Sequence, residues 1–119
     1  MSISDEYLQY VRERLEPLGQ ITIRKMFGGA GVYCDGVFFA VIDSNMLYFK
    51  VDDSNRPDYE ESGAMPFRPY GDEGYAMSYY EVPADVLEDN DLLRSWANKA
   101  ISIARNKPAK NDKGKLTGK

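Results

Sequence analysis

Histidine is absent from this sequence of 119 residues, and Cys34 is the only cysteine. No internal disulfide can therefore form. The absence of histidine excludes Ser-His and Cys-His nucleophile pairs, the facial triad of non-haem iron enzymes and every zinc site that mixes cysteine with histidine. Cys34 has no lysine or arginine beside it in the sequence, so we expect a buried or half-buried, unreactive thiol.

Long hydrophobic runs are also lacking. No stretch approaches the roughly 18 uninterrupted apolar residues of a membrane span. The N-terminal stretch "MSISDEYLQY" is acidic and amphipathic, unlike a secretory signal peptide. We therefore expect a cytoplasmic protein. Its 43% of hydrophobic residues and its nine Tyr, five Phe and one Trp indicate one folded domain, which we place at residues 1–104.

Charge is distributed unevenly along the chain. The net charge is −4, but the segment from Arg105 onward holds six basic residues and one acid, a net of +5, which leaves −9 on the preceding 104 residues. An acidic body repels nucleic-acid phosphates, so any nucleic-acid contact is expected to be weak or indirect. We expect residues 105–119 to form a disordered basic tail, with direct DNA binding through this tail as one alternative function.

Hydrophobic periodicity predicts an α+β fold with two layers, in which helices pack on an antiparallel sheet. Ser4 has the sequence context of an N-cap, and Asp35-Gly36 that of a type I′ hairpin turn. The expected order is one helix, three to four strands, a short helix, two strands and a last helical region that starts at Pro83. The expected segments are a helix from residue 4 to about 18, strands from residue 21 to 51 with turns at 35–36 and 43–45, a helix at 56–62, a hairpin at 67–82 that turns at 72–74, and a final helix with a stripe at Leu93, Trp96, Ala97, Ala100 and Ala104.

The strand in "VFFAVID" is apolar on both sides. Strict alternation would place Val37, Phe39 and Val41 on one face and Phe38, Ala40 and Ile42 on the other. We therefore expect either that both faces of this strand are covered by the chain, or that a partner covers one of them.

The glycines of "RKMFGGAGVYCDGVFFA" invite comparison with phosphate-binding loops. No Gly-Lys-Ser/Thr follows, and although Gly29 and Gly31 fit the start of a dinucleotide fingerprint, Cys34 stands where its third glycine is needed. That fingerprint also needs a helix next, whereas this segment continues as strand and hairpin. We expect the glycines to serve a bulge, a bend or a close backbone approach, with a nucleotide site as the minority alternative.

Few other residues suggest chemistry. The carboxylate pairs Asp52/Asp53 and Glu60/Glu61 are adjacent in sequence and cannot face each other, so solvated faces and helix caps are the favoured interpretation. In "AMSYYEVP", alternation sends Tyr79 and Tyr80 to opposite faces of a strand. Each can pack in the core, or one can anchor an interface.

Three segments together resemble a known family: "RKMFGGAGVYCDGVFFA", "LYFKVDDSNRPDYEESGAMPF" and "AMSYYEVPADVLEDNDLLRSWANKA". They are similar to the N-terminal domain of the TfoX/Sxy family, bacterial regulators of competence genes, over roughly residues 5–105. The resemblance implies a fold like that of secretion chaperones, no enzyme activity, no cofactor, and action through a transcription activator of the cyclic-AMP receptor type or RNA polymerase. Full-length members continue into a second, helical domain, so we expect a stand-alone N-terminal domain here.

We therefore expect a non-enzymatic regulatory or adaptor domain that binds another protein or a second copy of itself. Its candidate interface residues come from the glycine segment and the tyrosine segment, and none is assigned a catalytic, cofactor or metal role. They are Arg24, Lys25, Met26, Phe27, Gly28, Gly29, Gly31, Tyr79, Tyr80, Glu81 and Pro83. The alternative function is a small-ligand or nucleotide-binding module, or an unrecognised enzyme, that uses the glycine segment with Arg24, Lys25 and Tyr80.

Overall fold

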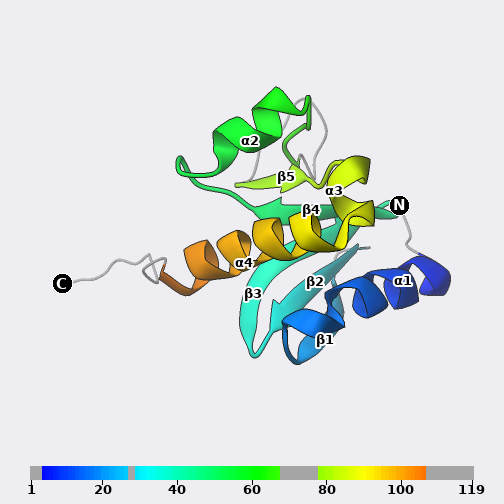
Figure 1. Ribbon diagram of the computed structural model, residues 1–119. Helices are drawn as coiled ribbons and strands as arrows, with labels where there is room; N and C mark the ends of the chain where they lie inside the picture. Colours follow the sequence, from blue (N-terminus) through cyan, green and yellow to red (C-terminus); the bar gives the residue numbers. More distant parts are fainter. Residues whose placement is uncertain (1–3, 27–28, 68–77, 107–119) are drawn as a thin grey trace.

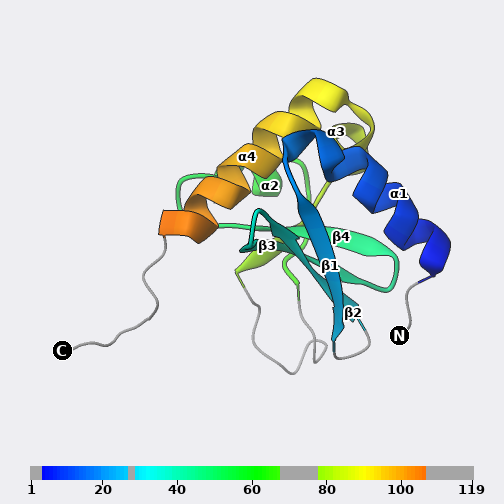
Figure 2. The ribbon, with the colours of Figure 1, turned by 90° about the horizontal axis from the view of Figure 1, so that it is seen from below.

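The computed structural model describes residues 4–26, 29–67 and 78–106 (Figure 1). A five-stranded antiparallel sheet runs in the order β1-β2-β3-β4-β5, and α1, α3 and α4 form a layer on one of its faces (Figure 2). The elements are α1 (Asp5–Leu15), the 3-10 turn η1 (Glu16–Leu18), β1 (Ile21–Met26), β2 (Gly29–Cys34), β3 (Val37–Asp43), β4 (Met46–Lys50), α2 (Arg56–Glu61), β5 (Tyr79–Glu81), α3 (Ala84–Glu88) and α4 (Asn90–Asn106). The predicted α+β class is confirmed.

Helix α1 begins and ends where its sequence requires. The Ser4 hydroxyl accepts a hydrogen bond from the Tyr7 backbone N–H at 3.1 Å, which confirms the predicted N-cap. Val11 and Leu15 are buried against the sheet. Pro17 cannot continue the helical hydrogen bonds, and the chain tightens into η1 before it enters β1.

Arg14 joins this first helix to the junction between α3 and α4. Its guanidinium donates two hydrogen bonds to the Leu87 carbonyl, at 2.7 and 3.0 Å, and one to the Asn90 side chain at 2.7 Å. Leu87 and Asn90 lie at the junction of α3 and α4, so one side chain of α1 holds this junction in place.

Two hairpins build the central strands. Asp35 and Gly36 have φ values of 50° and 85°, as the predicted type I′ turn between β2 and β3 demands. Ser44 and Asn45, between β3 and β4, have φ values of 54° and 58°. Positive φ at both turn positions matches the right-handed twist of the flanking strands, and this explains why the chain reverses tightly at each place.

The expected alternation along β3 is wrong, because a β-bulge interrupts it. Tyr33 pairs with Phe38 but Val32 pairs with Ala40, so Phe39 is an extra residue in β3. Phe39 and Ala40 are both fully buried in the core, whereas Phe38 is 36% exposed. The bulge thus places Ala40 and Ile42 on the same side as Phe39, and among the described residues the helices of the chain cover that side alone.

The region after α2 agrees with the predicted third hairpin as far as it is described. One strand, β5, pairs with β4, and on its other side Pro66 forms an isolated bridge with Tyr80. The Phe67 N–H donates to the Tyr79 carbonyl at 2.8 Å. The pairing is that of a hairpin, and its expected turn at 72–74 lies outside the described residues.

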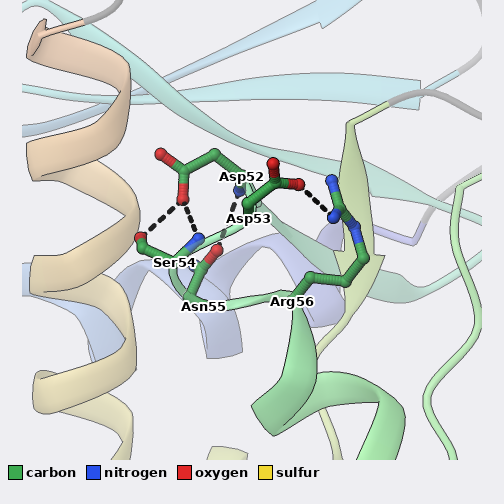
Figure 3. A network of polar contacts seen from close by, with 5 residues as sticks. All are labelled: Asp52, Asp53, Ser54, Asn55 and Arg56. Atoms are coloured by element: carbon green, nitrogen blue, oxygen red, sulfur yellow. Dashed lines mark hydrogen bonds and ion pairs between the residues drawn. The ribbon is translucent and has the colours of Figure 1, made fainter.

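Helix α2 starts from a polar turn, shown in Figure 3. The Asp52 carboxylate accepts hydrogen bonds from the N–H and the hydroxyl of Ser54, and the Ser54 hydroxyl bond is the main reason why the pKa of Asp52 is lowered. Asn55, 3% exposed, accepts from the Asp52 N–H at 2.8 Å. Arg56 pairs with Asp53. The carboxylates of Asp52 and Asp53 thus have different partners, in line with a structural role.

Helix α4 carries the long apolar stripe. Leu93, Ala97, Ala100, Ile101 and Ile103 are buried, and Trp96 and Ala104 pack against the core from a half-buried position. The helix extends through Asn106, so Arg105 and Asn106, expected in the tail, are helical. The rest of the tail lies outside the described residues. Within the part of the chain that is described, no helix is both long and apolar enough to cross a membrane.

Tyr59 of α2 closes the core between three elements. Its ring makes an edge contact with Trp96 of α4 at 4.6 Å between centroids and a tilted contact with Tyr80 of β5 at 5.9 Å. The residue is 1% exposed, and its hydroxyl has no hydrogen-bond partner among the described residues. Burial raises the pKa of this hydroxyl. The ring therefore stabilises the fold, whereas its desolvated hydroxyl opposes folding.

Replacing Tyr59 by Phe removes only the unpaired hydroxyl. We expect Tyr59→Phe to raise the free energy of unfolding by about 1 kcal/mol, measured by urea denaturation, whereas Tyr59→Ala should lower it by roughly 3 kcal/mol or more. Tyr10→Phe is the control, because Tyr10 is 37% exposed and its hydroxyl reaches water. A loss of more than about 1 kcal/mol in Tyr59→Phe would contradict the expectation.

Candidate functional site

The face of the sheet opposite α1, α3 and α4 holds the most distinctive cluster of side chains in the described residues; we call it the open face. Cross-strand pairing identifies its members, because side chains of paired residues lie on the same face. Tyr33 of β2 pairs with Phe38 of β3, and Lys50 of β4 pairs with Tyr79 of β5. Ile21, Cys34 and Phe49 lie on the other face, within the core.

Tyr33, Phe38 and Tyr79 form a continuous aromatic row on the open face. The rings of Tyr33 and Phe38 stack at 5.0 Å between centroids, and the rings of Phe38 and Tyr79 lie 5.9 Å apart. A cation lies over each end: the Arg24 guanidinium is 5.7 Å from the Tyr33 ring, and the Lys50 ammonium is 5.1 Å from the Tyr79 ring. Aromatic rings flanked by cations are typical of protein-binding surfaces.

Burial changes along the aromatic row. Tyr79 is 6% exposed but does not belong to the hydrophobic core cluster, and Phe38 is 36% exposed. Desolvation, with a smaller contribution from Tyr33, raises the pKa of Tyr79 to about 12. The row is thus anchored at Tyr79 and accessible at Phe38.

A second line of paired residues crosses all five strands of the open face. It begins with Arg24 on β1 and ends with Glu81 on β5, which places opposite charges at the two edges. In order, the line is Arg24, Gly31, Val41, Tyr48 and Glu81. Desolvation and the nearby Glu81 carboxylate both raise the pKa of Tyr48. The centroid of the Tyr48 ring also lies 4.8 Å from that of the Phe67 ring.

The glycine segment is a strand. Gly29 and Gly31 lie in β2, which leads through a tight turn into β3, and no helix begins there to receive a phosphate. A Cβ atom built on Gly29 would lie 2.4 Å from the Ile42 carbonyl oxygen. Gly29 is therefore required for a close approach of β2 to β3, in line with the structural interpretation of the glycines. Phe27 and Gly28 lie outside the described residues.

The remaining candidate residues do not gather at one site. Lys25 points to the helix face of β1, where its ammonium lies 3.7 Å from the Asp5 carboxylate. Tyr80 also lies on the helix face, against Tyr59, and Pro83 caps α3. Since β1 and β5 form opposite edges of the sheet, Arg24 and Lys25 are separated from Tyr80 by about 19 Å of strand spacing. The proposed nucleotide site of Arg24, Lys25 and Tyr80 is therefore not assembled. Of Met26, only the backbone position in β1 is described.

Two cavities in the described part of the chain lie away from the aromatic row. One of about 180 Å³ between α2 and α4 is lined by Tyr59, Trp96 and Lys99, among others, and one of about 140 Å³ is lined by Arg14, Asn90 and Arg94 with their neighbours. Neither contains a residue of the aromatic row. In the described ranges, no three carboxylate or cysteine side chains are grouped as metal ligands would be.

A comparison with protein families identifies the domain. A family model described as the TfoX N-terminal domain matches residues 13–104, most of the chain. The chain belongs to this family. The matched region runs from within α1 through all five strands and most of α4, so it contains the entire open face of this TfoX N-terminal domain. A comparison with curated proteins finds no match.

Tyr33 and Phe38 are functional candidates that sequence reasoning missed. The hairpin turn at Asp35-Gly36 was recognised, and it places the residues on either side of it opposite each other. The signal that could have found the pair is the placement of Tyr33 and Phe38 two residues before and after this turn. The bulge, which no turn residue announces, lies beyond this pair and changes the faces of the residues that follow Phe39.

Gly29→Ala tests the close approach of the two strands. The added methyl group meets a backbone oxygen and cannot be accommodated by a side-chain rotation, so we expect a loss of about 2 kcal/mol or more in the free energy of unfolding. Gly36→Asn is the matched control, because asparagine tolerates the φ of 85° and no atom lies within 4 Å of a Cβ there. Equal losses in the two variants, measured by urea denaturation, would contradict the packing argument.

The raised pKa of Tyr79 predicts alkaline instability. A tyrosine whose pKa is about 12 in the folded chain and 10 when unfolded holds its proton more tightly in the folded state. Its contribution to stability is therefore full below pH 10 and is lost as the pH rises from 10 through 12. Between pH 10 and 12 the free energy of unfolding of the original chain should fall as the pH rises. In Tyr79→Phe this fall should be less steep, by about 1.4 kcal/mol per pH unit. Tyr7→Phe should show a similar change, because the pKa of Tyr7 is also about 12. An unchanged slope in Tyr79→Phe would refute the assignment.

Proposed function

We propose that this TfoX N-terminal domain is a non-enzymatic regulatory domain that acts by binding another protein through its open face. The observation that carries the proposal is the aromatic row, which lies on the sheet face opposite α1, α3 and α4 and is accessible at Phe38. Large rings held in place by strands offer contact area with little loss of conformational entropy on binding.

Membership of the TfoX family supports a regulatory role in competence and transcription. By this relationship, the partners to test first are a transcription activator of the cyclic-AMP receptor type and RNA polymerase, and the compartment is the cytoplasm. An adaptor of this kind needs no reactive group, and the open face offers aromatic and charged side chains that recognise rather than transform a partner.

The alternative functions have less support. A nucleotide site that uses Arg24, Lys25 and Tyr80 would need residues from opposite edges of the sheet. Direct DNA binding would depend on the basic tail, whereas residues 1–104 carry a net charge of −9. Protein binding through the open face requires neither.

Binding of purified partners to open-face variants tests the proposal. The full chain is immobilised, and RNA polymerase and the receptor-type activator of the source bacterium are passed over it after nuclease treatment, with binding followed by interferometry. Phe38→Thr should weaken binding at least about tenfold, because it removes the accessible ring of the row but suits a strand.

Leu92→Gln is the matched control. Leu92 is 43% exposed on α4, so this variant also exchanges an exposed apolar side chain for a polar one, but away from the open face. It should bind like the original chain. Equal binding by Phe38→Thr, or the failure of both purified proteins to bind, would overturn the proposal.

A further inference from the structure

Strand β1 is an edge of the sheet whose outer backbone groups are unpaired among the described residues. The Gln20 carbonyl accepts a hydrogen bond from the Asp35 N–H at 2.9 Å, which shows that the backbone groups of residue 20 point toward the β2 side. In an antiparallel pair these directions alternate, so the backbone groups of Thr22 and Arg24 also face β2. Those of Ile21, Ile23 and Lys25 point outward.

A side-chain contact confirms this direction. Arg12 of α1 donates a hydrogen bond to the Ile21 carbonyl at 3.0 Å, from outside the sheet. The outward backbone groups of Ile23 and Lys25 have no hydrogen-bond partner among the described residues. Each of the two residues therefore presents one N–H and one carbonyl for binding. Figure 2 views the molecule from the side of this edge, with β1 in front of the other strands. The opposite edge differs, because residues 65–67 pair with the outer side of β5.

The charge beside this edge is opposite to that of the molecule. Arg12, Arg24 and Lys25 lie along β1, against a net charge of −9 for residues 1–104. Arg24 is exposed on the open face, and the Lys25 side chain is 67% exposed on the helix face. The acid beside them, Asp5, is 93% exposed and lies 3.7 Å from Lys25, so this ion pair is a weak one.

We propose that β1 binds an extended acidic segment of the partner protein, which adds to the sheet as a sixth antiparallel strand. This inference rests on the proposed protein-binding function and gives the chemistry of the partner. The outward groups of Ile23 and Lys25 supply four backbone hydrogen bonds, and carboxylates on the two faces of the added strand meet Arg24 and Lys25. The same cations disfavour pairing with a second copy, whose β1 would bring an equal set of positive charges.

Peptide binding to the full chain tests this arrangement. The probe is the synthetic peptide acetyl-Val-Thr-Glu-Glu-Thr-Val-amide, whose two adjacent glutamates point to opposite faces of a strand, and its counterpart has lysine in place of each glutamate. Backbone amide signals of the ¹⁵N-labelled protein are followed by NMR up to about 5 mM peptide, where a millimolar dissociation constant gives mostly bound protein. The acidic peptide should shift the signals of Ile23 and Lys25 in a saturable way, more weakly at high salt. The lysine peptide should not.

Three variants separate backbone pairing from charge. Lys25→Pro removes an outward N–H and leaves the bonds to β2, so affinity for the acidic peptide should fall at least about tenfold. Lys25→Ala retains the N–H and should lose only about twofold to threefold, and Arg24→Glu should favour the lysine peptide. Lys99→Glu on α4 makes the same change in net charge as Arg24→Glu, away from β1, and should bind like the original chain.

Each contrary result overturns the inference. These results are an absence of saturable shifts at Ile23 and Lys25, equal binding of the two peptides, or a dimer in sedimentation that Lys25→Pro abolishes. Failure of the edge is distinguishable from failure of the proposed function. If Lys25→Pro binds the purified partners as the original chain does while Phe38→Thr does not, the open face is retained and the added strand is rejected.

Discussion

The β-bulge in β3 is the constraint on which the rest of the structure depends. It admits Phe39 as an extra residue, so that Phe39, Ala40 and Ile42 all enter the core between sheet and helices while Phe38 lies on the other face. In a regular strand that kept the pair of Tyr33 and Phe38, Phe39 would still face the helices, but Ala40 and Ile42 would not face them together with it. One inserted residue thus places Ala40 and Ile42 in the core beside Phe39.

Local rules predict most of the scaffold from sequence. The N-cap at Ser4, the reversal at Asp35-Gly36 and the apolar stripe of α4 depend on neighbours within one or two turns, and each occurs as predicted. The faces of β3 were predicted incorrectly because a bulge is fixed by packing across strands, and no residue type in "VFFAVID" signals it. For the same reason the aromatic row was missed. Tyr33, Phe38 and Tyr79 become neighbours only when β2, β3 and β5 share one sheet.

The candidate residues chosen from sequence divide according to the register of the sheet. Arg24, Tyr79 and Glu81 lie on the open face, whereas Lys25 and Tyr80 lie on the helix face. Adjacent residues of a regular strand, without a bulge between them, separate in this way, so the pairs Arg24-Lys25 and Tyr79-Tyr80 cannot each form one patch on a sheet face. Such a pair can act together only where both faces meet, which is at an edge. Arg24 and Lys25 occupy such an edge, and this is why their adjacency has meaning there.

The open face and the β1 edge are two parts of one surface, joined at Arg24. Its guanidinium lies over Tyr33 at the end of the aromatic row, while its own backbone groups are bonded to β2. A strand added to β1 would therefore place its side chains beside Arg24 and extend the open face without altering it. In that arrangement the backbone hydrogen bonds supply affinity and fix the direction of the added strand, but they depend little on its sequence. Specificity for one partner over another therefore comes from the side chains. The acidic character of the body adds to this discrimination, because a net charge of −9 on residues 1–104 repels an acidic segment, whereas Arg12, Arg24 and Lys25 along β1 attract it.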